Sequence, residues 1–438
     1  MTEKITLAND LGNGSMKLGF NNDDWTVIPS IYADQRQQDM IAPVSFDNQQ
    51  QQDVYINDMF KHMNVSVQSP NISTTNRMFV GQSAADSNLL LHSFDVNDFA
   101  GKSTTDLAMI LTLSTIGAKA IKQNYLENNH QLGTDIDVNV TMTTALPIAE
   151  GKKPNVVDNY RDRYMNVDHM VTFHNFNQLV NVKIHFDLVT VALEGETAQY
   201  AIRKPITELA NGIEQDFSAH YPELAKAMNG APIYEVSDTL GIDIGEGTTD
   251  LAVFSNGQLN ALASSSLNSG YGNVLEEAMA DLLHNGYNMS SRLELQQLLS
   301  SEDNPLRRGK KAMALNAVNA QLDQMTDRIV HEISGVLRQV SNKVDVIYVY
   351  GGGSIPMEPV LRPALMNKIK AFVGDIDIPV VFIPAGYAQY LNDLGLNMIL
   401  QAVLATQQPK KNVMTNAPVE PQPAEQQLDP SNIFGGVQ

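Results

Sequence analysis

The sequence of 438 residues contains no cysteine. Disulfide bonds, thiolate metal sites and cysteine nucleophiles are therefore excluded, although this absence does not by itself fix the cellular compartment. Basic residues are few, since 29 Lys and Arg stand against 49 Asp and Glu and the formal net charge is −20. Nucleic-acid binding needs clustered Lys and Arg that displace counterions. We therefore expect no direct contact with nucleic acid, and any link to DNA would pass through a basic adaptor protein.

Long apolar runs are missing as well. The strongest one, residues 107–116, is too short to cross a bilayer and is predicted to be a buried helix. The first residues, Met-Thr-Glu-Lys, lead into a strand-like segment without the basic and apolar regions of a signal peptide. We therefore expect a cytoplasmic protein with no membrane segment. Single cores rarely grow beyond about 250–300 residues, so the length predicts two large lobes.

The stretch 239–254, Thr-Leu-Gly-Ile-Asp-Ile-Gly-Glu-Gly-Thr-Thr-Asp-Leu-Ala-Val-Phe, predicts a strand, a tight turn and a second strand. Gly245 and Gly247 lack side chains, so backbone N–H groups can approach an anionic oxygen, and Thr248 adds a hydroxyl donor. Asp243 and Glu246 would repel a phosphate unless a divalent cation, Mg²⁺ held through water, reconciles them. The alternative is an ordinary hairpin with a polar turn.

The N-terminus carries the same pattern. Residues 5–10 are predicted to form a strand that ends in Asp10, and a glycine turn and a second strand follow. The turn and the start of the second strand contain Gly12, Asn13, Gly14, Ser15 and Lys17. Two such hairpins can close on one nucleotide from opposite sides.

Glycines cluster at two further places in the sequence, one after a predicted strand and one before a predicted helix. Residues 344–350 are predicted to be a strand, and Gly351, Gly352 and Gly353 follow it, which brings backbone close to a ligand. Gly270 and Gly272 form a turn before a helix expected at about 273–284. Further helices are expected over most of 288–320 and over about 318–341.

An acidic pair follows the strand predicted at 182–193. Glu194 and Glu196 lie near the start of the next helix, where the helix dipole favours carboxylates, so capping is one interpretation. The other interpretation is that one of them orients a water for attack on a phosphate, as a general base must.

Two basic segments have a composition that would suit phosphate binding. Residues 100–104, Ala-Gly-Lys-Ser-Thr, look like a Walker A loop, but Val96 stands where that loop needs a glycine. We interpret them as a loop before a core helix at about 104–128. A basic cluster at Arg307, Arg308, Lys310 and Lys311 is interpreted as a solvated helix face, with a nucleotide contact as the alternative.

Two polar segments stand apart in composition. The Gln-rich residues 35–53 are predicted to be a mobile loop or a small variable subdomain. Residues 408–438 contain five prolines and many Gln and Asn, and they predict a disordered acidic tail. Leu428, Ile433 and Phe434 in the tail either dock on a partner or are incidental.

These elements resemble the superfamily of actin, sugar kinases and heat-shock chaperones, in which two lobes clasp a nucleotide. The resemblance covers about residues 1–407. Residues 10–20 look like the first phosphate loop, 241–250 like the second, and 350–354 (Tyr-Gly-Gly-Gly-Ser) like the adenosine motif. The resemblance implies a two-lobed α/β fold of the actin and ribonuclease-H type with the nucleotide in the interlobe cleft. The implied parts are lobe I (1–205, with a variable subdomain at about 30–100), lobe II (206–384), a C-terminal helix returning to lobe I (385–407) and the tail (408–438).

Within the superfamily, Thr-Ala-Leu-Pro at 144–147 and the closing segment 387–396 look most like bacterial actins of the ParM plasmid-segregation group. This likeness implies that Asp10 and Asp243 organise Mg²⁺ and its waters, and that Glu194 occupies the place of the water-orienting residue. ATP is the implied nucleotide, with GTP as the alternative. The residues implied to hold the phosphates are Gly12, Asn13, Gly14, Ser15, Lys17, Gly245, Glu246, Gly247 and Thr248. The residues implied to border the adenosine are Gly351, Gly352 and Gly353, with Gly270 and Gly272 nearby in the nucleotide site.

The same likeness implies an ATPase that polymerises into filaments and moves plasmid or other DNA through an adaptor. A cytoskeletal role with another cargo is one alternative, and a small-molecule kinase of the same superfamily is another. A kinase needs a positioned base for its acceptor, and the sequence offers no clear extra Asp for that purpose. A chaperone role is weaker still, because no substrate-binding β domain follows residue 407.

Overall fold

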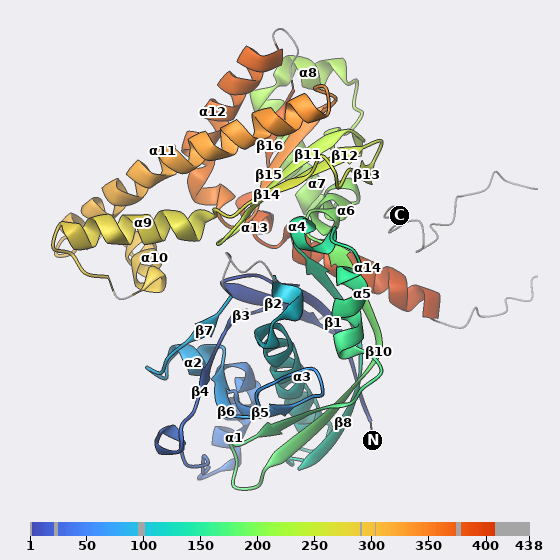
Figure 1. Cartoon of the computed structure of the whole chain (residues 1–438), viewed down its shortest axis with the longest axis vertical. Coiled ribbons are helices and arrows are strands. Elements are labelled where there is room, and N and C mark those ends of the chain that lie inside the picture. The colour runs from blue at the N-terminus through green and yellow to red at the C-terminus, as the bar shows by residue number, and fades with distance from the viewer. Residues whose placement is uncertain are drawn as a thin grey trace, which may run out of the picture.

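The computed structural model describes residues 2–21, 25–94, 101–289, 291–302, 304–373 and 378–407. Within these residues, two β-sheets with packed helices occupy the two ends of an elongated molecule (Figure 1). The tail predicted at 408–438 and Val96 lie outside the described residues. In the described part of the chain, no helix combines the length and the apolar character that crossing a membrane requires.

The first sheet has ten strands in the order β3-β2-β1-β8-β10-β9-β5-β6-β4-β7. Its centre is parallel, because β8 pairs in parallel with β1 on one side and with β10 on the other. The strands are β1 (Glu3–Leu11), β2 (Ser15–Phe20), β3 (Thr26–Pro29), β4 (Ile31–Asp34), β5 (Asn64–Gln68), β6 (Arg77–Val80), β7 (His92–Ser93), β8 (Asp135–Leu146), β9 (His169–Phe173) and β10 (Val180–Leu193).

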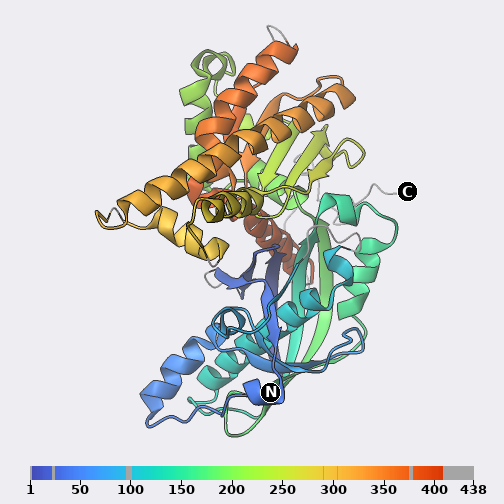
Figure 2. The ribbon, with the colours of Figure 1, turned by 60° about the vertical axis from the view of Figure 1, so that its left-hand side comes forward.

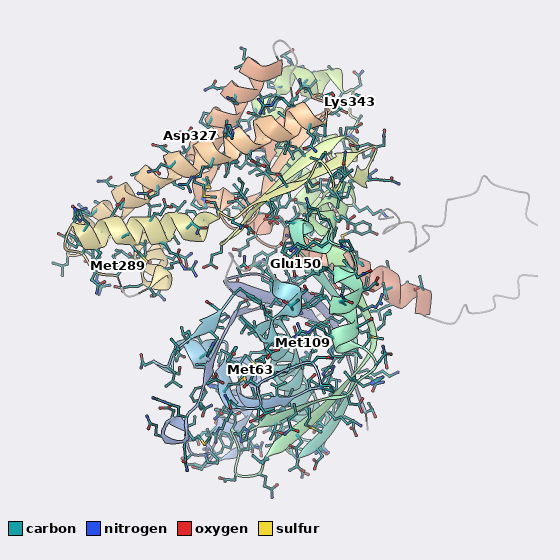
Figure 3. The ribbon with its side chains drawn as sticks, viewed as in Figure 1. Met63, Met109, Glu150, Met289, Asp327 and Lys343 are labelled. Atoms are coloured by element: carbon teal, nitrogen blue, oxygen red, sulfur yellow. The ribbon has the colours of Figure 1, made fainter. Side chains whose placement is uncertain are left out.

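Helix α3 (Asp106–Glu127) forms the centre of this lobe. It begins after Thr105, whose hydroxyl accepts a hydrogen bond from the Ala108 N–H. Every residue from 107 to 116 is buried, which confirms the predicted core helix. Because α3 contacts β1, β4, β5, β8, β9 and β10, the sheet curves around it. Met63 and Met109, both fully buried, lie inside this lobe (Figure 3).

Shorter helices cover the rest of the first sheet. The Gln-rich segment contains the 3₁₀ helix η1 (Gln37–Asp39) and the start of α1 (Gln49–Asn57), whose first turn is capped by Asn48. Gln35 is buried and donates to Asn64 at 2.8 Å, so this segment is attached to β5. The remaining short elements are α2 (Gln82–Ala85), α4 (Ile148–Gly151), α5 (Val156–Tyr164), η2 (Met59–Lys61) and η3 (Lys102–Thr104).

The second sheet has the strand order β13-β12-β11-β15-β16, and β14 pairs with β12. Its strands are β11 (Thr239–Ile244), β12 (Thr249–Ser255), β13 (Gln258–Leu259), β14 (Ser265–Leu267), β15 (Val346–Tyr350) and β16 (Val380–Phe382). Its helices are α6 (Glu196–Arg203), α7 (Thr207–His220), α8 (Pro222–Ala227), α9 (Tyr271–His284), α10 (Arg292–Ser300), α11 (Arg308–Gln339), α12 (Ser354–Val373), α13 (Ala385–Ala388) and α14 (Leu391–Gln407), with the 3₁₀ helix η4 (Ile233–Glu235).

Side chains of β15 alternate between two cores, as the period of two along a strand requires. Ile347 and Val349 join the cluster that includes residues of α9, α11 and α12. Val346, Tyr348 and Tyr350 join the cluster on the other face, with α6 and α7. This sheet is therefore covered on both faces, which explains why all five residues of β15 are buried.

Helix α11 corrects one expectation. We predicted one helical region to about 320 and another from about 318, whereas the structure has a single 32-residue helix from Arg308 to Gln339. Leu322, Met325, Ile329 and Ile333 follow each other at spacings of three and four and keep one face buried through the predicted boundary. Figure 2 shows α9, α10 and α11, in yellow to orange, extending to one side of the second sheet.

Helix α14 joins the two halves of the molecule. It packs against α6 and also against β1, β2 and β8 of the first sheet, and Thr143 donates to the Leu396 carbonyl at 3.0 Å. The C-terminal helix thus contacts the first sheet. The boundaries placed at residues 205, 384 and 407 remain predictions.

Candidate functional site

A cavity of 570 Å³ lies where the two sheets face each other, which is within the usual size of a ligand pocket. The β1–β2 turn enters it from the first sheet, and the β11–β12 turn enters it from the second. The glycines after β15 form a third wall. The predicted residues that line it are Asp10, Gly12, Asn13, Gly14, Ser15, Lys17, Glu194, Asp243, Gly245, Glu246, Thr248, Gly351, Gly352 and Gly353.

Three predicted glycines do not line the cavity. Gly247 is buried within its turn. Gly270 and Gly272 instead support the turn from behind: the Gly272 N–H donates to the Glu246 carbonyl at 2.7 Å, and a Cβ on Gly270 would lie 2.5 Å from the same oxygen. The resemblance implied a place near the adenosine for these two glycines, and that remains a prediction.

The first hairpin is closed by short-range contacts. Asp10 and Lys17 are partners in the register of β1 and β2, and Lys17 Nζ lies 2.8 Å from Asp10 Oδ2. A buried serine of the neighbouring segment fixes the turn, because Ser30 Oγ donates to the Gly12 carbonyl and the Ser30 N–H donates to the Gly14 carbonyl. A Cβ at Gly12 would meet the Ser15 carbonyl at 2.5 Å, so this turn requires glycine.

Lys17 also contacts Asp393 at the start of α14, at 3.5 Å. Burial alone would lower the pKa of Lys17, but Asp10, Asp393 and Asp243 outweigh it and raise that pKa. Asp393 is fully buried, and burial raises the pKa of its carboxyl well above the ordinary value although Lys17 opposes the shift. The lysine predicted to hold phosphate thus already has two acid partners.

The second hairpin pairs two acids at the position where the first hairpin pairs an acid with a lysine. Its register pairs Asp243 with Asp250, and directly paired residues project to the same face, so two carboxyls are brought together. Burial, with the charge of Asp250 adding to it, raises the pKa of Asp243 to about 7 against the hydrogen bond from Asn392 and the charge of Lys17. Burial also raises the pKa of Asp250, against hydrogen bonds that include one from Thr248.

Asn392 connects this hairpin to the other half of the molecule. Its amide donates to Asp243 Oδ2 at 2.6 Å, while its carbonyl oxygen accepts from Thr197 Oγ1 at 2.7 Å and from the Gly195 N–H at 3.4 Å. One side chain of α14 therefore contacts both the second hairpin and the start of α6. Asn392 lies within the closing segment 387–396, and the sequence pattern alone gave it no role.

Glu194 lies between β10 and α6. Its N–H donates to the Leu146 carbonyl, and its side chain is buried at the wall of the cavity. Burial, together with the charges of Asp250, Asp10 and Asp243, raises the pKa of Glu194 to about 8 although Lys102 opposes the shift. Glu196, the other candidate, is the first residue of α6 and is not among the lining residues. Of the two acids, Glu194 is therefore the one that lines the cavity, and its role in positioning a water stays a prediction.

Lys102 was missed. We interpreted Ala-Gly-Lys-Ser-Thr as a loop before a helix, and a loop of that kind is present, but the lysine side chain lines the cavity. Its Nζ donates to the Leu11 carbonyl at 2.8 Å and lies 3.4 Å from Glu194 Oε1. A buried lysine requires acidic or carbonyl partners, but the sequence alone does not show that residues 11 and 194 supply them.

The basic cluster is not among the residues that line the cavity. Arg307 and Arg308 are exposed at the start of α11, and Lys310 lies 3.6 Å from Glu294. This supports the interpretation as a solvated helix face. The cavity is also lined by residues of α9, α10, α12 and the segment before α14. They are Tyr271, Gln296, Leu299, Ser300, Ile355, Pro356 and Gln389.

The acids fit a magnesium ion that keeps most of its water. Among the described residues there is no group of three or more His, Cys, Asp or Glu side chains that could enclose a metal. Asp10 and Asp243 nevertheless line one cavity, and Mg²⁺ is commonly bound by one or two carboxylates together with waters and phosphate oxygens. A cation there would also relieve the repulsion that raises the pKa of Asp243.

Comparison with known proteins supports the fold. A family model described as the archaeal actin homologue MreB-like, C-terminal, matches residues 241–363. The crystal structure of the actin-like protein Alp7A aligns with a TM-score of 0.64 at 14% identity, covering 92% of this chain and 98% of that chain. Bacillus thuringiensis ParM with ATP aligns with a TM-score of 0.57 at 15% identity, covering 93% and 100%.

A non-polymerisable quadruple mutant of pCBH ParM aligns with a TM-score of 0.54 at 16% identity, covering 91% of this chain and 100% of that chain. No curated protein matched the sequence. At these identities the alignments show the fold and no more. The chain has an actin-like fold, as the sequence resemblance implied.

Proposed function

We propose that this chain is an ATPase that binds ATP with Mg²⁺ between its two lobes and forms filaments whose assembly depends on the bound nucleotide. The observation that carries the proposal is the single cavity into which both glycine hairpins, Glu194 and the three glycines after β15 project. Similarity to Bacillus thuringiensis ParM, which has been crystallised with ATP, supports ATP as the nucleotide, with GTP as the alternative.

In this proposal the two turns hold the phosphates. Backbone N–H groups at Gly12 and Gly14 would donate to phosphate oxygens. On the second turn the Gly245 N–H already donates to the Thr248 carbonyl at 2.9 Å, so the Thr248 hydroxyl, turned away from Asp250, would be the donor there. Asp10 and Asp243 would hold the waters of Mg²⁺, which supplies charge neutralisation for the phosphates when it is bound. Glu194 would orient the attacking water and accept its proton.

The same contacts explain how hydrolysis could control assembly. Phosphates held by both hairpins connect the two lobes, so ATP favours a closed arrangement. Losing the γ-phosphate removes contacts shared by the lobes and shifts the equilibrium by the difference in contact energy. Similarity to pCBH ParM, whose mutant is described as non-polymerisable, supports filament formation as the output.

We further propose that the filament moves plasmid or other DNA through an adaptor protein. The net charge of −20 disfavours direct contact with DNA and suits a basic partner, which would be attracted by electrostatic complementarity. A cytoskeletal role with a different cargo uses the same ATPase cycle. The two roles are separated by whether a basic DNA-binding protein accelerates assembly or stabilises the filaments.

The test combines light scattering with phosphate release after ATP and Mg²⁺ are added to the purified chain. We expect scattering to rise and phosphate to appear, and we expect both signals to be lost in Asp243→Ala. A small-molecule kinase would give no ATP-dependent scattering and would transfer the γ-phosphate to an added acceptor. That pair of results would replace the filament proposal.

A further inference from the structure

Lys102 stands between two parts of the site. Leu11, whose carbonyl accepts from Lys102 Nζ at 2.8 Å, immediately precedes the first glycine turn. Glu194, 3.4 Å from the same Nζ, is the candidate water-positioning acid. Among the described residues these two oxygens are the hydrogen-bond acceptors of Nζ, and an ammonium group has three donors. The charge of Lys102 is therefore placed where the end of a bound phosphate chain and the attacking water would meet.

The loop that carries Lys102 is anchored from two sides. Glu150 is buried, and its two carboxylate oxygens accept from the N–H groups of Lys102 and Ser103 at 3.0 and 2.7 Å. Arg163 donates to the carbonyls of Ser103 and Thr105 at 2.7 and 2.9 Å. Figure 3 shows Glu150 at the junction of the two lobes. The loop is thus a fixed platform for one long side chain.

Gly101 makes this anchoring possible. Its φ of +76° lies in the region that favours glycine, and a Cβ there would lie 2.3 Å from the Glu150 carboxyl carbon. A side chain at position 101 would therefore push Glu150 away from the two N–H groups. The Gly-Lys pair that suggests a Walker A loop thus has a different role. Gly101 leaves room for the carboxyl of Glu150, and Glu150 positions the loop that carries Lys102.

The charge of the cavity gives Lys102 a distinct role. Lys17, the other lysine that lines it, lies within ion-pair distance of both Asp10 and Asp393. Among the described residues Lys102 has one acid within ion-pair distance, Glu194, and its charge also acts on Asp250. A triphosphate brings several negative charges into a cavity already lined by Asp10, Asp243, Asp250 and Glu194. A positioned ammonium near the terminal phosphate would stabilise the charge of the transition state.

We infer that Lys102 is a catalytic residue of the proposed ATPase, which donates to an oxygen of the γ-phosphate while it holds Glu194 in place for the attacking water. In the step, the water oxygen forms a bond to the γ-phosphorus, and the bond from that phosphorus to the bridging oxygen breaks. ADP leaves with the electron pair. Glu194 takes one proton from the water and later releases it to solvent, and Lys102 keeps all of its protons.

A purely structural ion pair is the competing explanation. Removing one partner of a buried ion pair is destabilising, because it leaves the other charge buried without compensation. Both explanations therefore predict a loss of stability for Lys102→Met, which keeps the length of the side chain and removes the charge. Only a catalytic lysine predicts a large loss in the rate of hydrolysis by the folded variant.

The experiment measures the Kd for a fluorescent ATP analogue and the single-turnover rate of phosphate release for the full chain. We expect Lys102→Met to lower the rate by about 100- to 1,000-fold, as removal of one transition-state donor does, with Kd changed by less than about fivefold. Lys226→Met, an exposed lysine paired with Glu223, is the matched control and should leave both quantities unchanged. Glu150→Gln should lower the rate less than Lys102→Met does, because the loop loses its charged acceptor but retains the lysine.

A double variant tests whether Lys102 and Glu194 act together. If they do, Lys102→Met combined with Glu194→Gln should be little slower than the slower single variant, because residues that act as a unit are not additive. A wild-type rate in Lys102→Met, or full additivity in the double variant, would overturn the inference.

If Lys102→Met does not fold, Lys102→Gln decides by the same rate criterion, since its amide can still donate to Leu11 and Glu194 without a charge. The inference depends on the proposed function, and their failures are distinguishable. A wild-type chain that neither binds nor hydrolyses ATP would overturn both, whereas a hydrolysing wild type with an unaffected Lys102→Met overturns the inference alone.

Discussion

The two hairpins that meet at the cavity share a shape and differ in charge. In β1–β2 the paired position joins Asp10 to Lys17, and in β11–β12 it joins Asp243 to Asp250. The first hairpin is neutralised within itself, and burial of its lysine is compensated by acids. The second hairpin buries two acids together, so each holds its proton more tightly than usual. A ligand that brings a divalent cation therefore changes the second hairpin more than the first.

The largest expected effect comes from Asp243→Ala, which removes the acid that we assign to the magnesium waters. We expect ATP affinity in the presence of Mg²⁺ to fall by about 1,000-fold, equivalent to about 4 kcal/mol. Isothermal titration calorimetry with excess Mg²⁺ and with a chelator measures this. The same affinity for variant and wild type under both conditions would remove Asp243 from the metal assignment.

The second effect concerns stability and is expected in the first hairpin. Lys17→Met leaves Asp10 and the buried Asp393 without their cation, and removing one partner of a buried pair costs about 3 kcal/mol or more. We expect a corresponding loss in the free energy of unfolding, measured with urea in the absence of nucleotide. Lys226→Met is the control, since its ion pair is exposed. Equal stability of both variants would show that the first hairpin does not depend on internal neutralisation.

The third effect is on hydrolysis. Glu194→Ala should slow phosphate release by about 100-fold, as loss of a general base does, while ATP-dependent assembly remains. An unchanged release rate would exclude Glu194 from that role.

The pH dependence of the wild type gives a second measure of Glu194. The carboxyl must be ionised to accept a proton, and its pKa is raised to about 8 in the unliganded chain. We therefore expect kcat/KM, which reports on the free enzyme, to fall roughly tenfold for each pH unit below that value. A flat profile between pH 6 and 9 would contradict this assignment.

The smallest expected effect is a gain in the free energy of unfolding. A carboxyl whose folded pKa is raised loses stability as pH rises from its unfolded pKa towards the folded one, because the folded state resists ionisation. Asp250→Asn removes this loss, so we expect the unfolding free energy at pH 8 to rise by about 1 kcal/mol, with little change near pH 4. Thermal unfolding at both pH values measures it. Destabilisation at pH 8 would show that the ionised Asp250 is favourably paired.

Features made by residues that lie close together in the sequence could be predicted, and features that depend on distant residues could not. Both hairpins were predicted, because the strand period, the glycines and the terminal acid all lie within one short stretch. The core helix at 107–116 was predicted from its uninterrupted apolar run. The break predicted near residue 318 was wrong, because the turns of α11 on either side share one buried face and nothing local marks its continuity.

By itself, the sequence determined the two glycine hairpins, the acids at their ends and the resemblance to an actin-like fold. These depend on neighbours: Asp10 and Lys17 are separated by 7 positions. The tertiary structure alone decided that Lys102 contacts Glu194, 92 positions away, and that Asn392 donates to Asp243, 149 positions away. The physical reason is that local patterns fix strand, turn and face, whereas the charge that compensates a buried acid can come from any element that the fold brings within reach.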